Sequence, residues 1–123
     1  MDQSPRAMTE RESAVLGFLL SLDDPRLAPL REQAKVARVT ARWDCCATIE
    51  FDVDRASAHP ATGLPSPAVE TQTVDRSDAN SAFDLILFLD GGWLKTLELV
   101  PYGKQPPTEF PTVDTFDPPW CDR

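Results

Sequence analysis

Two carboxylate side chains, Glu50 and Asp52, stand two residues apart in a stretch where apolar and polar residues alternate. A pair of carboxylates can act as general acid and base, or can bind a hard cation. In a strand, however, every second residue points to the same face, and acidic residues are ordinary on a solvated face. Arg38 and Arg42 in the preceding stretch supply the opposite charges that cross-strand pairs favour. The pattern therefore favours a solvated strand face over a catalytic or metal site.

The three cysteines and the single histidine do not form a reactive set. Cys45 and Cys46 are adjacent and Cys121 is distant, and neighbouring cysteines are poorly placed for an ordinary disulfide. His59 stands in another segment, so the sequence has neither a thiol with a nearby base nor the ligand spacing of a zinc site. We expect turn or buried cysteines in a reducing compartment, and no catalytic residue, metal or cofactor.

Composition argues against several classes of function. The chain has 123 residues, of which 41% are apolar, enough for one domain core. A net charge of −8 would repel a nucleic-acid backbone. The longest apolar run, residues 14–20, is far shorter than the roughly 20 residues that span a bilayer. Acidic residues also stand where a signal peptide would be basic and then apolar. We expect an acidic cytoplasmic protein that binds neither nucleic acid nor membrane.

The first third of the chain predicts two helices. Residues 9–12 have the pattern of a capping box, and apolar residues follow at helical spacing as far as Leu22. Asp24 followed by Pro25 predicts a second helix start. Pro29 would fall at the fifth residue of that helix and distort it.

From Val36 the apolar period changes to two, which predicts strands. Residues 36–43 and 47–53 predict an antiparallel hairpin, 54–67 a variable surface loop, and 69–74 an edge strand. The strongest pattern joins 82–90 to 93–100 through Asp90-Gly91-Gly92, because glycine can take the positive φ values of a tight turn. A strand follows these glycines, so they do not form a phosphate-binding loop.

The stretch 83–89 is apolar in both directions, which is typical of a central strand. One set of side chains would face the N-terminal helix: Ile49, Phe51, Leu85, Leu87, Leu89, Leu97 and Leu99. The opposite face would carry a mixed set: Glu50, Asp52, Ile86, Phe88, Leu94 and Glu98. Its apolar centre needs a cover, for which three alternatives remain open: the C-terminal tail, a second copy, or a foreign partner or ligand.

The last 23 residues, 101–123, contain six of the twelve prolines. Each proline removes an amide donor and fixes its φ, so this segment predicts an extended, irregular tail after a domain of residues 1–100.

The order of these features resembles an uncharacterised family of small bacterial proteins. The resemblance rests on segments 27–36 (LAPLREQAKV) and 89–99 (LDGGWLKTLEL), followed by Tyr102-Gly103 and Pro106-Pro107. It covers about residues 9–110 and leaves out the tail and the loop 54–67. The resemblance implies a compact α+β domain without known activity, so it carries over no catalytic residue.

We predict an α+β fold with one or two N-terminal helices packed on a mainly antiparallel sheet of four or five strands. Residues 66–123 carry ten acidic and four basic residues, a net charge of −6 that would attract a basic partner. The first hypothesis is a non-enzymatic interaction module whose acidic sheet face docks a basic protein or a second copy. Neutralising a basic toxin is one form of this role.

Two other classes of function remain open. A small-molecule binding domain would have a pocket of several hundred cubic ångströms between helix and sheet, lined by Trp43, Phe51 and Trp93. A hydrolase would use Glu50 and Asp52, or Cys45.

Overall fold

A computed structural model describes residues 5–104 and 107–121. Two helices and six strands follow in chain order: α1 (Glu10–Leu20), α2 (Ala28–Val36), β1 (Ala37–Arg42), β2 (Ile49–Val53), β3 (Val69–Gln72), β4 (Phe83–Asp90), β5 (Trp93–Pro101) and β6 (Trp120–Cys121). The strands form one antiparallel sheet in the order β1-β2-β5-β4-β3-β6. The α+β prediction is confirmed, but the sheet has six strands where four or five were expected, because the tail supplies β6.

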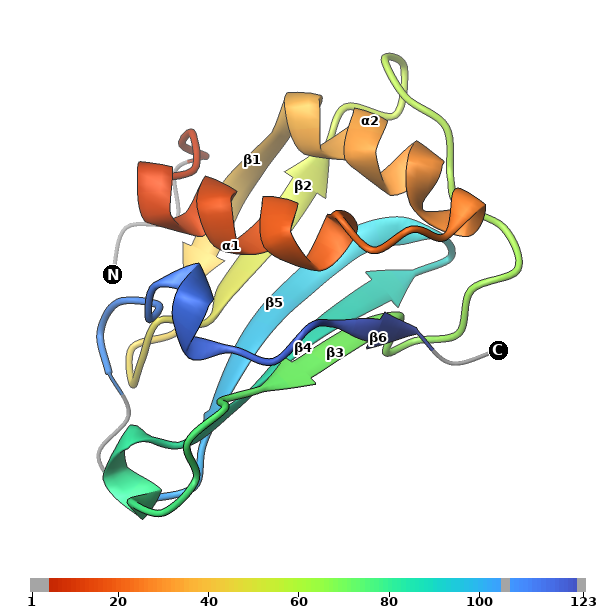
Figure 1. Cartoon of the computed structure of the whole chain (residues 1–123). Coiled ribbons are helices and arrows are strands. Elements are labelled where there is room, and N and C mark those ends of the chain that lie inside the picture. Colours follow the sequence, from red (N-terminus) through yellow and green to blue (C-terminus); the bar gives the residue numbers. More distant parts are fainter. Residues whose placement is uncertain (1–4, 105–106, 122–123) are drawn as a thin grey trace.

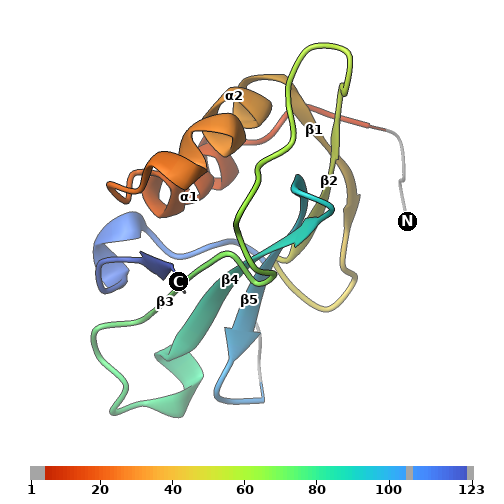
Figure 2. The ribbon, with the colours of Figure 1, turned by 90° about the vertical axis from the view of Figure 1, so that its right-hand side faces the viewer.

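Both helices cover the same face of the sheet (Figure 1). Figure 2 shows the molecule turned by 90°. The 3₁₀ turn η3 (Val113–Thr115) lies on the same side of the sheet as the helices, beside α1. The seven side chains expected to face the helix are all buried there, from Ile49 on β2 to Leu99 on β5. Of the helices in the described ranges, none is long and apolar enough to cross a membrane.

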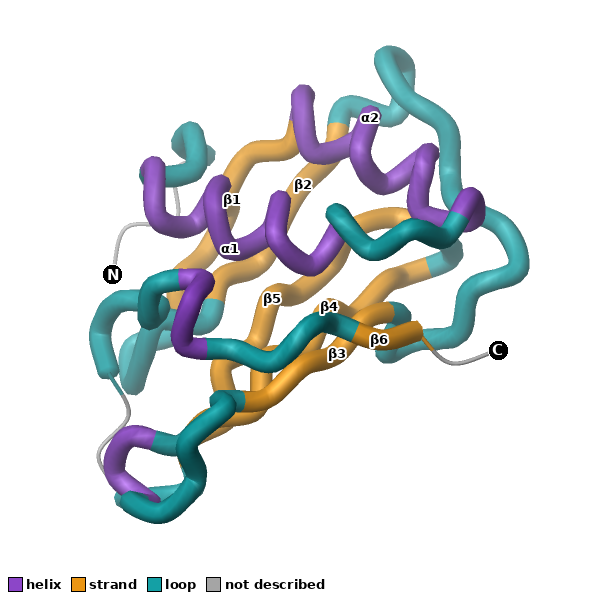
Figure 3. Tube along the Cα trace, in the orientation of Figure 1, coloured by secondary structure: helices purple, strands orange, loops and turns teal. Residues whose placement is uncertain are grey.

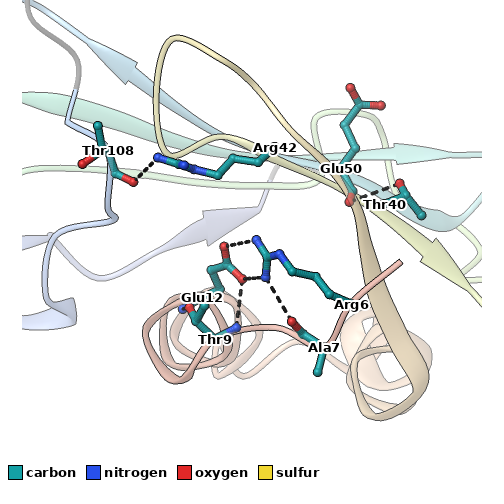
Figure 4. A network of polar contacts seen from close by, with 8 residues as sticks. All are labelled: Arg6, Ala7, Thr9, Glu12, Thr40, Arg42, Glu50 and Thr108. Carbon is teal, nitrogen blue, oxygen red and sulfur yellow. Dashed lines mark hydrogen bonds and ion pairs between the residues drawn. The ribbon is translucent and has the colours of Figure 1, made fainter. Parts of the chain in front are cut away.

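The start of α1 is held by a capping box that also reaches β1. The Thr9 amide donates to Glu12 Oε1 (2.9 Å), and the Glu12 amide donates to Thr9 Oγ1 (3.1 Å). Arg6 donates from both Nη atoms to the two Glu12 carboxylate oxygens, at 2.8 and 2.9 Å (Figure 4). The Arg6 backbone bonds in both directions with Val39, so one carboxylate ties the helix cap to the edge strand.

The second helix begins differently from the prediction. Asp24 caps a 3₁₀ turn, η1 (Pro25–Leu27), by accepting the Arg26 amide, and α2 begins only at Ala28. Pro29 therefore lies in the first turn of α2, where its missing amide has no helical partner to lose. The proline is compatible with a regular helix because the 3₁₀ turn takes up the preceding residues.

A buried amide side chain joins α2 to the β4–β5 hairpin. Gln33 is fully buried; its Nε2 donates to the carbonyls of His59 and Gly92 (2.9 and 3.0 Å), and its Oε1 accepts the Leu94 amide (2.9 Å). Gly91 and Gly92 take φ values of 57° and 87° in the two-residue turn. This confirms the expected hairpin and shows how its turn is attached to the helix layer.

The loop 54–67, drawn in teal on its way from β2 to β3 in Figure 3, is irregular but attached at several points. The Ala61 amide donates to the Gly92 carbonyl (2.9 Å). Ser66 Oγ donates to the Leu89 carbonyl (3.0 Å) and accepts the Leu89 amide (2.9 Å). These bonds satisfy backbone groups at the end of the hairpin, which is why the loop lies against it rather than standing free.

The tail is also part of the domain. Phe110 and Phe116 are buried in the core, and β6 pairs with β3 through Val69–Cys121 and Glu70–Trp120. The sequence predicted β3 as an edge strand. This prediction is wrong, because β6 of the tail pairs with β3 and takes the edge position.

We expect Glu12→Ala to lower the free energy of unfolding by about 1–2 kcal/mol, since it removes the reciprocal cap bond and the Arg6 ion pair. Burial alone would raise the pKa of Glu12, but hydrogen bonds from Arg6 and the Thr9 amide outweigh it and lower the pKa below the ordinary 4.5. The stabilisation is therefore complete above pH 4.5 and is lost as the pH falls through the lower folded-state pKa. Urea unfolding of the wild type and of Glu12→Ala, at pH 7 and in acid, measures the difference in the free energy of unfolding. Glu10→Ala in the same turn is the control, and an equal loss there would contradict the prediction.

We expect Gln33→Leu to lower the free energy of unfolding by about 2–3 kcal/mol, because the buried Leu94 amide would lose its acceptor and the part-buried carbonyls of His59 and Gly92 would each lose a donor. Urea unfolding measures the loss. The neighbouring exposed Glu32→Leu is the matched control and should change stability by less than about 0.5 kcal/mol. Similar losses in both variants would show that the buried amide has no special role.

Candidate functional site

The sheet face turned away from the helices, called the outer face here, is the main candidate for an interaction site. Alternate residues of β4 and β5 point to it and are partly exposed. The predicted site residues Glu50, Asp52, Ile86, Phe88 and Glu98 lie on this face, and Figure 4 shows the Glu50 carboxylate pointing away from α1. The structure therefore brings five of the six predicted residues together.

The sixth residue, Leu94, is on the opposite face. It is only 3% exposed and stands opposite Leu89 on the helix side. The prediction was wrong because the register shifts between Phe88 and Leu89, where an extra residue in β5 reverses the alternation. Lys95 is exposed at this bulge, and the Leu94 amide is bonded to Gln33 beneath the sheet.

Carboxylates flank the apolar centre of the outer face. Ile86 stands opposite Glu98 on β5 and opposite Glu70 on β3, so it lies between two carboxylate side chains. Adjacent strands are about 4.8 Å apart, which places the two acidic residues about 10 Å apart across the sheet. Phe88 follows on the same strand, opposite Thr96. A half-exposed apolar strip thus has an acidic residue on each side.

Aromatic side chains stand around this centre. Trp43 is 38% exposed and donates from Nε1 to Glu50 Oε2 (3.0 Å). Tyr102, 43% exposed, donates its hydroxyl to Asp84 Oδ1 (2.7 Å) beyond one end of the strip. Trp120, 40% exposed, is on β6 opposite Glu70. The place of Trp120 on this face does not follow from local sequence patterns, because the proline-rich tail predicts no strand.

The outer face is acidic overall. Five carboxylate residues lie on it: Glu50, Asp52, Glu70, Asp84 and Glu98. The basic residues that offset them are Lys95, whose Nζ is 3.5 Å from Glu50 Oε1, and Arg38 opposite Asp52. Two further basic groups lie at its margins, Arg55 over the Trp93 ring and Arg76 close enough to influence Tyr102. The remaining excess of negative charge would repel an acidic ligand and attract a basic one.

The other chemistry-bearing residues do not form a catalytic set. Cys45 and Cys46 lie in the β1–β2 turn, where their sulfur atoms are brought together. His59 is exposed in the loop, far along the chain from either. Within the described residues, no group of three or more His, Cys, Asp or Glu side chains is placed to hold a metal ion.

The pocket expected between helix and sheet is not formed by the three residues predicted to line it. Trp43 is on the outer face, bonded to Glu50. Phe51 and Trp93 line a hollow of about 110 Å³, smaller than the several hundred cubic ångströms expected. A larger cleft of about 940 Å³ lies elsewhere, between α1, β1 and the tail.

Comparisons of the chain with protein-family models, with curated proteins and with solved structures give no match. The resemblance to a family of small bacterial proteins therefore stays a prediction, and the proposals below rest on the geometry of this chain.

We expect Tyr102 to titrate above its ordinary pKa of 10, mainly because its hydroxyl donates to the Asp84 carboxylate, which favours the protonated phenol. It is the single tyrosine of the chain, so phenolate absorbance reports it alone. Asp84→Asn should move the pKa down toward 10, whereas Asp90→Asn in the hairpin turn should leave it unchanged. A wild-type pKa at or below 10 would show that the hydrogen bond does not form in solution.

Proposed function

We propose that the protein is a non-enzymatic interaction module that docks a basic segment of another protein on the outer face of its sheet. The observation that carries the proposal is the partly exposed apolar strip of Ile86 and Phe88, in which Ile86 lies between the carboxylates of Glu98 and Glu70. A partner with apolar side chains between lysines or arginines would match this strip in both shape and charge.

The two kinds of side chain support different parts of binding. Burying Ile86 and Phe88 would supply affinity, because each fully buried large apolar side chain is worth about 1.5–3 kcal/mol. The carboxylates Glu98 and Glu70 would supply selectivity and faster association, because complementary charge steers the encounter. A single exposed apolar residue needs no explanation, but an apolar strip within an acidic face favours a specific partner.

Charge also favours a foreign partner over a second copy. A symmetric dimer built on this face would place the same patch on both subunits. The acidic residues of one patch, among them Glu50, Asp52 and Glu98, would then lie against the acidic patch of the other subunit, and like charges brought together disfavour association. A homodimer is therefore an outcome that would overturn the proposal in its present form.

The tail does not take the place of a partner. Its second described part, 107–121, buries Phe110 and Phe116 on the helix side. Tyr102 in the first part, 101–104, bonds to Asp84 at one end of the outer face, and Trp120 stands opposite Glu70 at its margin. Neither stands opposite Ile86 or Phe88 in the sheet. Tail cover was one of the alternatives left open by the sequence, and the described residues favour the other two.

A synthetic peptide of alternating lysine and leucine is a suitable probe, since its strand form has one basic and one apolar face. We expect it to bind the intact protein in low salt and to lose affinity as salt rises, measured by tryptophan fluorescence. Glu98→Lys should weaken binding about 10-fold, because it removes one charge-assisted contact and adds a charge that repels the basic peptide. Glu32→Lys, the same charge change on the exposed side of α2, should have a several-fold smaller effect.

Two results would overturn the proposal. One is equal weakening by Glu98→Lys and Glu32→Lys, which would mean that only the net charge of the protein matters. The other is self-association, seen by light scattering, that is lost in Ile86→Asp. A peptide in which glutamate replaces lysine should not bind, and binding of that peptide would also count against an acidic docking face.

A further inference from the structure

A cleft of about 940 Å³ opens on the side of the molecule away from the outer face, between the first turn of α1, the end of β1 and the tail. Its lining includes Arg11, Arg42, Ala47 and Thr108. Cavities of this volume are typical of small-molecule sites. Polar and charged groups line the cleft as well as apolar ones. Among them, Arg11 and Arg42 are the groups that could bind an anionic ligand.

Two guanidinium groups from different elements are fixed in this cleft by the tail. Arg42 donates from Nη2 to the Thr108 carbonyl (2.6 Å), as Figure 4 shows. Arg11 donates from Nη1 to the Phe110 carbonyl (2.7 Å). An arginine has five N–H donors in a planar fork, and each of these bonds uses one nitrogen. The remaining donors are held in place before any ligand arrives.

The two groups are close enough to act on one molecule. Thr108 and Phe110 are two residues apart, so their carbonyls are separated by at most about 7 Å of chain. Each guanidinium group lies within hydrogen-bond distance of its carbonyl. The two bonding nitrogens are therefore at most about 12 Å apart, a span that a molecule with two oxyanion groups on a short linker can bridge.

The charges around the cleft leave Arg42 uncompensated. Arg6 and Glu12 neutralise one another through two short bonds. Arg11 is 3.9 Å from Glu109, a solvated contact that contributes little. Within residues 5–104 and 107–121, no carboxylate lies within 4 Å of the Arg42 guanidinium. Glu10 also lines the cleft and would limit its affinity for anions.

We propose that this cleft binds a small organic molecule with two oxyanion groups, either a diphosphate ester or a dicarboxylate. Arg42 would bind one group through its free donors, and Arg11 would bind the other. Arginine suits both chemistries because its fork matches the geometry of phosphate and carboxylate oxygens. The inference is independent of the docking face, which is built from other residues; the cleft has three arginines and three glutamates in its lining, and Arg6 and Glu12 among them are already paired.

Calorimetric titration of the full chain with inorganic pyrophosphate and, separately, with succinate tests the site and separates the two ligand chemistries. We expect one probe to bind in the sub-millimolar range, about 10-fold more tightly than the other. Arg42→Gln and Arg11→Gln should each weaken binding about 10-fold, the loss of one charge-assisted bond. Arg38→Gln on the same strand but on the outer face is the matched control and should change affinity by less than about 2-fold.

Arg42→Lys keeps the proposal testable if the glutamine variant loosens the tail. Lysine retains the positive charge and can still donate to the Thr108 carbonyl, but it lacks the planar fork. We expect Arg42→Lys to melt at the wild-type temperature and still to bind the probe several-fold more weakly. Absence of binding for both probes, or equal weakening by Arg38→Gln and Arg42→Gln, would overturn the assignment.

Discussion

The three hydrogen bonds of the buried Gln33 side chain hold the layers of this protein together. A helix, an irregular loop and a hairpin turn each leave backbone groups without partners, and burial of such groups is costly. The side-chain amide of Gln33 donates to the His59 carbonyl of the loop and to the Gly92 carbonyl of the turn, and it accepts the Leu94 amide. These bonds fix the position of the start of β5 relative to α2.

The same contact determines what the outer face can present. Because Leu94 turns toward the helices, Lys95 is exposed at the bulge and the alternation restarts at Thr96. Glu98 then comes to stand beside Ile86, and the apolar strip acquires its acidic border. Without the shift, Leu94 would lie on the outer face with Ile86 and Phe88, and Lys95 would point toward the core.

Most of the architecture could be predicted from local patterns, and the differences have specific causes. The cap at Thr9, the two hairpins and the inner face follow from spacing and glycine chemistry, and the structure confirms them. The bulge at Lys95 was missed because strict alternation was carried from Leu97 back to Leu94, although the spacing of three between these leucines departs from the period of two. The β6 strand was missed because proline content outweighs a two-residue pairing signal. The cleft joins Arg11 and Arg42 with a tail distant in sequence, so no local pattern could predict it.

The segment that pairs with β3 has a consequence for how the sheet ends. Residues 115–121 run along β3, with bonds from Val74 to Thr115 and from Asp117 to Gln72, and with β6 beyond them. Pro118 and Pro119 lie in the middle of this outermost segment and have no amide to offer. A neighbouring molecule seeking to add its own strand there would find the ladder interrupted. The prolines disfavour regular structure in the tail. At the edge of the sheet they also disfavour the addition of a strand from another molecule.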